Sequence, residues 1–355
     1  MKKHLLITPS QVLAFRQDLQ VVGVFNPGAT IVDEKLVLVV RVAVKLFEQR
    51  EGYFAWLRFI DGKLETEWLP LDLFDCDDSR VMRRLCDGKV LLSSVSYFQL
   101  VWIDNYRERP EDWQLRMGEI ILPQGPYETY GIEDARCTWV DGRCYMTYTS
   151  VSSHGACTSL MTTTNFCTFQ RHNVIFVCEN KDVVLFPDRV DEKLFALHRP
   201  VSATKFCSPE IWTASSIDGV AWGNHELFLS GSHLFEGDRI GAGTPPVRFD
   251  DRYLAFYHAS EKAKQPSLVG RYVGGLIEMD ILDGKVQLLR KSTEPLLVPT
   301  ELWELEGFVP NVVFPTAMIH ADDQAEFNWY VLYGAADTCI GVATISTADL
   351  RKAIE

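Results

Sequence analysis

One pattern recurs along this chain: a polar or Gly/Pro-rich start, an apolar strand, a turn, a second apolar strand and a polar end. Its copies occupy residues 25–42, 132–150, 181–200, 241–260 and 309–337. In an antiparallel hairpin the start of the first strand and the end of the second lie at the same end, so each copy gathers its polar residues in one place. Radial repetition of small antiparallel sheets around a channel makes a β-propeller. The repeat therefore predicts an all-β fold, a five-bladed β-propeller with a central axial site.

The rest of the chain fits one propeller domain over residues 1–355, with short terminal extensions. Strand-like runs rich in β-branched and aromatic residues dominate, and Asp-Gly turns such as Asp141-Gly142 separate them. Helical periodicity is limited to residues 10–17 and 348–355. In the long interval between the first two copies we expect strands at 53–60 and 90–103, which would complete the first blade and open the second. A β-sandwich is the structural alternative.

Charge and cysteine usage exclude several classes of protein. The net charge of −13 argues against nucleic acid and anionic membrane surfaces as partners, because both require a broad basic face. The first apolar stretch is too short for a signal peptide or a membrane span, so we expect a cytoplasmic protein. The nine cysteines are odd in number and scattered without a C-x-x-C pair. This favours reduced, mostly buried thiols over a zinc site or a disulfide framework.

Two adjacent carboxylates open the second copy, Glu133 and Asp134, and Arg136 follows them. Adjacent strand residues point to opposite faces, so we expect only one of the two carboxylates to face the axis. The other would then make a structural hydrogen bond. A turn with a local ion pair is the simpler alternative for so short a pattern.

A second group of candidates consists of side chains that carry positive charge or donate hydrogen bonds, all at the same ends of successive copies. Its members are Lys181, His198, Arg199, Arg239, Tyr257 and His258. Basic residues that converge without carboxylate partners favour a dianion, because each phosphate oxygen accepts charge-assisted hydrogen bonds. For each residue alone, a solvated charge or a core histidine is the simpler interpretation.

Motifs of other catalytic classes are missing from the sequence, which contains no G-x-S-x-G, no H-E-x-x-H and no P-loop. We also see no convincing cluster of metal ligands. Trp212, Trp222 and Trp303 are candidates for stacking on sugar rings, although aromatic residues in strands are more often part of the core.

A longer series of motifs covers essentially the whole chain: FNPGA, GIEDxR, NKDVVLFP, LHRP, RIGAGTPP, YHA, VPNVVFP and YGAAD, in that order. Together they resemble glycoside hydrolase family 130, the mannoside phosphorylases and related β-mannosidases. The resemblance implies a five-bladed propeller and inverting, reversible phosphorolysis of β-1,2-linked mannobiose or mannooligosaccharides to α-mannose 1-phosphate. It implies inorganic phosphate as co-substrate, with no metal and no other cofactor. A homo-oligomer is compatible with the sequence.

The resemblance also implies roles for individual residues. Asp134 would protonate the leaving oxygen indirectly, through the 3-hydroxyl of the mannose that is cleaved. The phosphate site would consist of Lys181, Arg199, Arg239 and His258, with Tyr257 as a neighbour. The substrate-binding residues would be Asn26, Arg41, Arg136, Asp182, His198 and Asp337.

The sequence departs from the family at two places. Ala135 stands where the family commonly has proline, and segment 43–130 is longer than in compact members. We expect this insertion to shape the site of the leaving sugar.

Several alternatives stay open. NKDVVLFP also resembles the branch of the family that acts on mannosyl-β-1,4-N-acetylglucosamine, and a mannosyl-β-1,4-glucose phosphorylase is a further alternative. A phosphate-independent β-1,2-mannosidase would need a carboxylate that activates water, for which Glu210 and Glu236 are the candidates. A carbohydrate-binding propeller without catalytic activity is the alternative from a different class, because a fold alone does not establish an enzyme.

Overall fold

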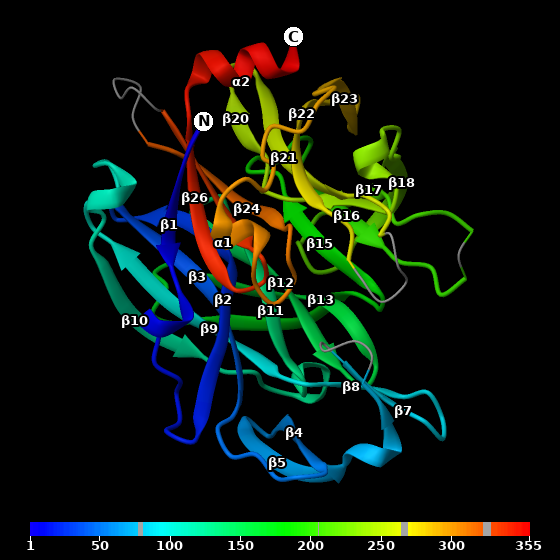
Figure 1. Cartoon of the computed structure of the whole chain (residues 1–355). Coiled ribbons are helices and arrows are strands. Elements are labelled where there is room, and N and C mark those ends of the chain that lie inside the picture. The colour runs from blue at the N-terminus through cyan, green and yellow to red at the C-terminus, as the bar shows by residue number, and fades with distance from the viewer. Residues whose placement is uncertain (77–80, 205, 264–268, 322–327) are drawn as a thin grey trace.

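The computed structural model describes residues 1–76, 81–204, 206–263, 269–321 and 328–355. Antiparallel sheets make up most of it, with short helical segments between them (Figure 1). The mostly-β prediction is therefore confirmed. The strands follow one another along the chain in five groups, each built around one copy of the sequence repeat.

The first two groups are joined in one eight-stranded sheet. The first contains β2 (Leu19–Val32), β3 (Lys35–Leu46), β9 (Val95–Ile103) and β10 (Leu115–Ile121). The second contains β11 (Gly131–Val140), β12 (Arg143–Ser152), β13 (Gly155–Thr163) and β14 (Gln170–Phe176). A single parallel pair, Gly131 with Ser96, connects them. Gly131 is required there because its φ is +125° and a Cβ atom would lie 2.6 Å from the Ser96 backbone nitrogen.

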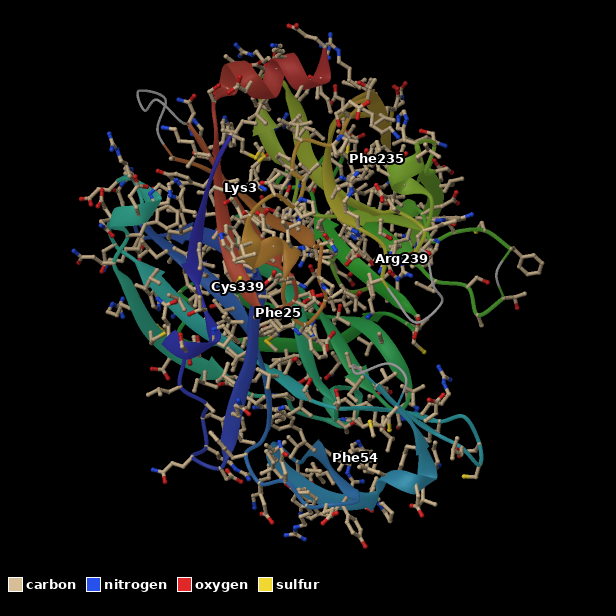
Figure 2. The ribbon with its side chains drawn as sticks, viewed as in Figure 1. Lys3, Phe25, Phe54, Phe235, Arg239 and Cys339 are labelled. Carbon is tan, nitrogen blue, oxygen red and sulfur yellow. The ribbon has the colours of Figure 1, made fainter. Side chains whose placement is uncertain are left out.

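The remaining three groups are separate sheets. The third contains β15 (Asn180–Leu185), β16 (Leu194–Pro200), β17 (Ile211–Ser216) and β18 (Gly223–Leu229). The fourth contains β19 (Arg239–Ala242), β20 (Val247–Phe249), β21 (Arg252–Ser260), β22 (Tyr272–Leu282) and β23 (Lys285–Lys291). The fifth contains β24 (Val313–His320), β25 (Trp329–Ala335), β26 (Cys339–Ile345) and the N-terminal β1 (Lys2–Ile7). Lys3 in β1 therefore lies beside the last strand of the chain (Figure 2).

Five apolar clusters lie between consecutive groups. Buried side chains of the first and second groups share one cluster, those of the second and third another, and the series continues through the third, fourth and fifth groups. The largest cluster joins the fifth group back to the first. Each sheet thus buries its two faces against two neighbours, which matches the apolar alternation of the hairpins.

The insertion between β3 and β9 forms two small sheets of its own. One is the hairpin of β4 (Tyr53–Ile60) and β5 (Lys63–Pro70), and the other contains β6 (Phe74–Asp75), β7 (Val81–Arg84) and β8 (Val90–Leu92). The prediction that strand 53–60 completes the first blade is wrong, because β9 pairs directly with β3 and leaves this hairpin at the foot of the molecule (Figure 1). The predicted strand 90–103 is divided into β8 and β9, and β9 belongs to the first group rather than opening the second.

Helical segments are short. They are α1 (Leu302–Leu305), α2 (Thr347–Ile354) and the 3₁₀ turns η1 (Pro9–Gln11), η2 (Leu71–Leu73), η3 (Pro110–Asp112), η4 (Pro126–Glu128) and η5 (Leu234–Glu236). The predicted C-terminal helix is confirmed by α2, whose N-cap Ser346 accepts a hydrogen bond from the Asp349 backbone. The predicted helix at 10–17 is wrong, because only η1 forms and no residue of η1 is buried.

None of the nine cysteines forms a disulfide. Four are buried, and five are exposed: Cys76, Cys86, Cys167, Cys178 and Cys207. The expectation of mostly buried thiols is therefore wrong.

Candidate active site

Three hairpins share one irregularity within their first strand. Asn26, Asp134 and Asp182 have φ angles of 48°, 55° and 56°. Asn and Asp adopt this left-handed conformation more readily than most residues. The ladder shifts register at all three positions, as it does at a β-bulge, which re-aims the side chain. The same local backbone irregularity thus changes the direction of a polar side chain in each of the first three groups.

Arg41 connects the first group to both carboxylates of the second. Its Nη1 donates to Asp134 Oδ1 at 3.0 Å and its Nη2 to Glu133 Oε1 at 2.7 Å. Asn26 Nδ2 also donates to Asp134 Oδ1, at 3.0 Å, whereas no described residue donates to Oδ2. The expectation that the two carboxylates point to opposite faces is wrong, because the bulge turns both toward one guanidinium.

The charge of Arg41 is strongly supported by its surroundings. Burial lowers the pKa of its guanidinium, but Glu133, Asp134 and Asp337 outweigh burial and the pKa is raised. The guanidinium also lies over the ring of Phe25, 4.5 Å from its centroid. Arg41 is therefore a fixed cation that holds Asp134 in place.

Asp182 is the centre of a second buried cluster. Its Oδ2 lies 2.9 Å from His258 Nε2 and 3.2 Å from Arg199 Nε. Burial raises the pKa of the Asp182 carboxyl, but Arg199 and His258 more than offset this and lower it. The side chains of His258 and Asp182 fit together because residue 241 is glycine. A Cβ atom at that position would lie 2.3 Å from His258 Nε2 and 2.6 Å from Asp182 Oδ2.

Arg136 joins the second group to the fourth. Its Nε donates to the Gly243 carbonyl at 2.6 Å and its Nη1 to the Asp134 carbonyl at 2.8 Å. The residue is 1% exposed, and its Nη2 has no hydrogen-bond partner among the described residues. Burial lowers the pKa of Arg136, and its charge in turn lowers the pKa of Asp182.

The predicted cations differ in their partners. Arg239 Nε lies 2.6 Å from Asp238 Oδ2, and Arg199 is paired with Asp182. Lys181 faces Arg199 in the strand register and has no ion-pair partner in the described ranges. The expectation of cations without carboxylate partners is therefore wrong for Arg199 and Arg239. Arg239, which Figure 2 labels, is still near enough to Asp182 for the carboxylate to raise its pKa.

Tyr257 and His198 lie on the other side of their strands. The Tyr257 hydroxyl donates to Glu236 Oε1 at 2.7 Å, inside the core between the third and fourth groups. His198 stacks on Phe176, and its Nε2 lies 3.1 Å from His225 Nδ1. Successive strand residues alternate between faces, so these two point away from the side occupied by their neighbours His258 and Arg199. Their positions do not fit the predicted phosphate and sugar contacts.

A cavity of about 380 Å³ opens beside Arg41. Its wall includes three residues of the site, Arg41, Glu133 and Asp337. The rest of the wall was not predicted residue by residue and consists of Val22, Gly23, Phe25, Ala43, Lys45, Leu92, Ser93, Ser94 and Phe308. Five of these residues fall in segment 43–130, which was expected to shape the site of the leaving sugar. The only sequence signal for Phe308 is its place directly before the VPNVVFP motif. Nothing in the sequence links residues 92–94 to the repeats.

Two kinds of feature are absent from the described residues. No group of three or more His, Cys, Asp or Glu there could hold a metal ion. None of the helices that the structure describes is long and apolar enough to cross a membrane.

Comparison with known proteins supports the motif series. The family described as beta-1,4-mannooligosaccharide phosphorylase matches residues 95–355. The chain is 31% identical over 360 residues to a beta-1,2-mannobiose phosphorylase of Listeria innocua, covering 99% of this chain and 96% of that one. It is 34% identical over 230 residues to a 1,2-beta-oligomannan phosphorylase of a Thermoanaerobacter strain, covering 63% and 71% of the two chains.

A solved structure shows the same relationship. The Listeria innocua beta-1,2-mannobiose phosphorylase in complex with beta-1,2-mannobiose matches with a TM-score of 0.87 and 28% identity, over 100% of this chain and 99% of that one. The match spans both the repeats and the insertion between them, so the family extends over the full described fold. This chain belongs to glycoside hydrolase family 130.

Proposed function

We propose that this protein is an inverting glycoside phosphorylase that cleaves β-1,2-linked mannobiose or mannooligosaccharides with inorganic phosphate. The product is α-mannose 1-phosphate, and the reaction is reversible. The observation that carries the proposal is a carboxylate, Asp134, fixed by Arg41 and Asn26 and followed along the groups by a cationic set. The names of the relatives that match over most of the chain support the substrate class.

The five strand groups are, on this proposal, the blades of a five-bladed propeller over residues 1–355. Support comes from the five apolar clusters, each shared by consecutive groups and the last joining group five to group one. The pairing of β1 with β26 gives the last blade a strand from the N-terminus. Closure of this kind covers the two apolar sheet faces that a linear array would leave open at its ends.

Asp134 is the proposed acid. Its Oδ1 accepts two hydrogen bonds, which leaves Oδ2 as the oxygen for proton exchange with the substrate. The proton passes from Oδ2 to the 3-hydroxyl of the mannose, and the proton of that hydroxyl passes to the leaving oxygen. Asn26, Arg41, Asp182 and Asp337 are the proposed contacts of the mannose hydroxyls.

Phosphate takes the place of the water-activating base of an inverting hydrolase. At neutral pH it is already a nucleophile, so the protein has only to bind it and aim it at the anomeric carbon. Lys181, Arg199, Arg239 and His258 are the proposed phosphate contacts. Lys181 is available for this because no described carboxylate neutralises it, and His258 Nδ1 has no hydrogen-bond partner among the described residues.

The hydrolase alternative with Glu236 as the base is less well supported. It needs a carboxylate free to activate water, and Glu236 is 2% exposed with both oxygens engaged. Lys291 Nζ donates to Oε1 at 2.8 Å, and the Ser232 backbone donates to Oε2 at 2.7 Å. A carboxylate committed to these contacts has no lone pair directed at a water beside Asp134.

Purified protein incubated with β-1,2-mannobiose, with and without phosphate, tests the proposal. We expect equal amounts of mannose 1-phosphate and mannose, formed only when phosphate is present. Mannose alone would identify a hydrolase. Turnover of a β-1,4-linked mannoside in place of the β-1,2-linked one would correct the linkage, and the absence of product from either would favour a binding protein.

The exposed, unpaired thiols support a reducing compartment, and we propose the cytoplasm.

A further inference from the structure

Part of the cavity wall has no role in the proposed cleavage of the mannose. Arg41, Glu133 and Asp337 belong to the site around Asp134, whereas the rest of the wall comes from β2, β3, the end of β8 with the segment after it, and the loop before β24. Cavities of about 300 Å³ or more are large enough to hold small ligands. The cavity thus extends from the site around Asp134 toward residues that have no role in the proposed phosphorolysis.

Phe308 is the large aromatic residue on this unused wall that is open to solvent. It is 48% exposed, although its backbone is held firmly. Its N–H donates to Thr338 Oγ1 at 2.9 Å, and the N–H of Val309 donates to the Ala336 carbonyl at 3.0 Å. Both partners flank Asp337, so the ring is anchored to the turn that carries a predicted substrate contact.

The loop also packs too closely on this turn to shift easily. A Cβ atom at Gly307 would lie 2.6 Å from both Ala336 Cβ and Thr338 Oγ1. An exposed aromatic ring on a fixed backbone loses little conformational freedom when a ligand covers it, which favours binding. The place of this ring on the cavity wall, rather than its exposure alone, makes it a candidate contact for a ligand.

The tryptophans predicted to stack on sugars occupy different environments. Trp222 packs against Phe176 and donates its indole N–H to the Gly219 carbonyl at 3.0 Å. Trp303 stacks on Tyr333 in the core between the fourth and fifth groups. Neither lines the cavity, and Trp212 does not line it either.

We propose that Phe308 is the platform for the leaving sugar, the mannose unit that departs when the bond is cleaved and that acts as acceptor in the reverse reaction. The inference rests on the proposed function. A pyranose ring has an apolar face of C–H groups that stacks on an aromatic ring, and hydroxyls at its rim that need polar partners. The Lys45 ammonium and the Ser94 hydroxyl, which line the same cavity, are suited to those hydroxyls. Ser94 follows the last strand of the insertion, so the cavity-lining residues of segment 43–130 contribute to acceptor recognition, whereas the β4–β5 hairpin of the insertion has no residue in the wall.

The experiment compares Phe308→Ala and Phe308→Trp with the wild type in both directions. For Phe308→Ala we expect the KM for mannose, with mannose 1-phosphate as donor, to rise roughly three- to tenfold, as loss of one aromatic stack predicts. The KM for phosphate in phosphorolysis should stay within about twofold. Phe308→Trp keeps a stacking face and should restore the acceptor KM. Tyr53→Ala is the matched control, because Tyr53 is 46% exposed on the β4 hairpin and does not line the cavity.

An unchanged acceptor KM in Phe308→Ala, with an active wild type, would overturn the proposal. An equal rise in the KM for phosphate would also overturn it, since it would indicate a general distortion. A wild type without turnover would instead refute the proposed function. Calorimetric titration with β-1,2-mannobiose would then decide about Phe308, and equal affinity of wild type and Phe308→Ala would reject the stacking role.

Discussion

Arg41 and Asp134 lie on neighbouring strand groups and meet at 3.0 Å between Nη1 and Oδ1. The contact forms only when the first and second groups are packed together, because the residues are 93 positions apart in the chain. Orientation of the proposed acid is therefore a product of assembly of the sheets. The same guanidinium is engaged by Glu133, which fixes its rotation about the side chain.

Replacement of Asp134 by asparagine tests the acid. The asparagine side chain would keep the shape and the left-handed backbone, but its amide has no carboxyl proton to supply. Loss of a general acid typically costs about 10²- to 10⁴-fold in rate, so we expect a kcat decrease of that size. Initial rates of mannose 1-phosphate release from β-1,2-mannobiose measure it.

Asp283→Asn provides the control for that substitution. Asp283 is exposed in a turn and has a φ of 52°, so the exchange has the same chemistry and the same backbone demand. Its activity should equal that of the wild type. Wild-type rates in Asp134→Asn would remove Asp134 from the mechanism.

Replacement of Lys181 by methionine tests the phosphate site. Lys181 has no ion-pair partner among the described residues, so its removal leaves no carboxylate uncompensated. A hydrogen bond to a charged group is worth about 1.5–3 kcal/mol, which corresponds to a roughly 10- to 100-fold rise in the KM for phosphate. The KM for β-1,2-mannobiose at saturating phosphate should change much less. Lys352→Met, on the exposed face of α2, is the control. If Lys181→Met raised the KM for phosphate and the KM for β-1,2-mannobiose equally, Lys181 would not be a specific phosphate contact.

Sequence alone was sufficient to find the repeats and the hairpins that carry the polar residues. The prediction that the start of the first strand lies beside the end of the second strand of a repeat is confirmed where Lys181 faces Arg199 and Gly241 faces His258. This worked because apolar alternation and turn residues are local signals.

The bulges were not predicted, because alternation assumes a regular ladder and a bulge breaks it. Regular alternation put Glu133 and Asp134 on opposite faces, yet one guanidinium binds both. Asn or Asp near the start of three copies was the available signal, since these residues favour a positive φ. Phe308 and Ser94 could not be found, because long-range packing brings their loops to the cavity.

Acid stability should depend on His198. Burial, followed by the neighbouring His225, lowers the pKa of His198 to about 3. In the unfolded chain this histidine has an ordinary pKa near 6.5 and is protonated more readily than in the folded protein. Neutral His198 therefore contributes fully to the free energy of unfolding above about pH 6.5, and this contribution is lost as the pH falls toward 3. The free energy of unfolding falls between pH 7 and pH 4, and we expect this fall to be about 3 kcal/mol smaller in His198→Phe than in the wild type.

Urea unfolding at a series of pH values measures this difference. His154→Phe is the control, because His154 is exposed. Parallel curves for wild type and His198→Phe would show that His198 does not cause the acid sensitivity.

The three buried glutamates that accept a tyrosine hydroxyl define the last prediction. The pairs are Glu128 with Tyr148 at 2.6 Å, Glu236 with Tyr257 at 2.7 Å and Glu304 with Tyr333 at 2.7 Å. Each glutamate also binds a cation from another strand: Arg171, Lys291 and Lys3, respectively. The repetition in three groups indicates that Tyr257 serves the fold.

Tyr257→Phe should therefore lower the unfolding free energy by about 1–2 kcal/mol, because it leaves a buried carboxylate oxygen with one partner fewer. Tyr148→Phe and Tyr333→Phe remove the same contact in two other groups and should have effects of similar size. None of the three should change the KM for phosphate, since each hydroxyl is directed at a glutamate inside the core. A rise of more than about threefold in that KM for Tyr257→Phe alone would return Tyr257 to the phosphate site and make its bond to Glu236 a secondary feature.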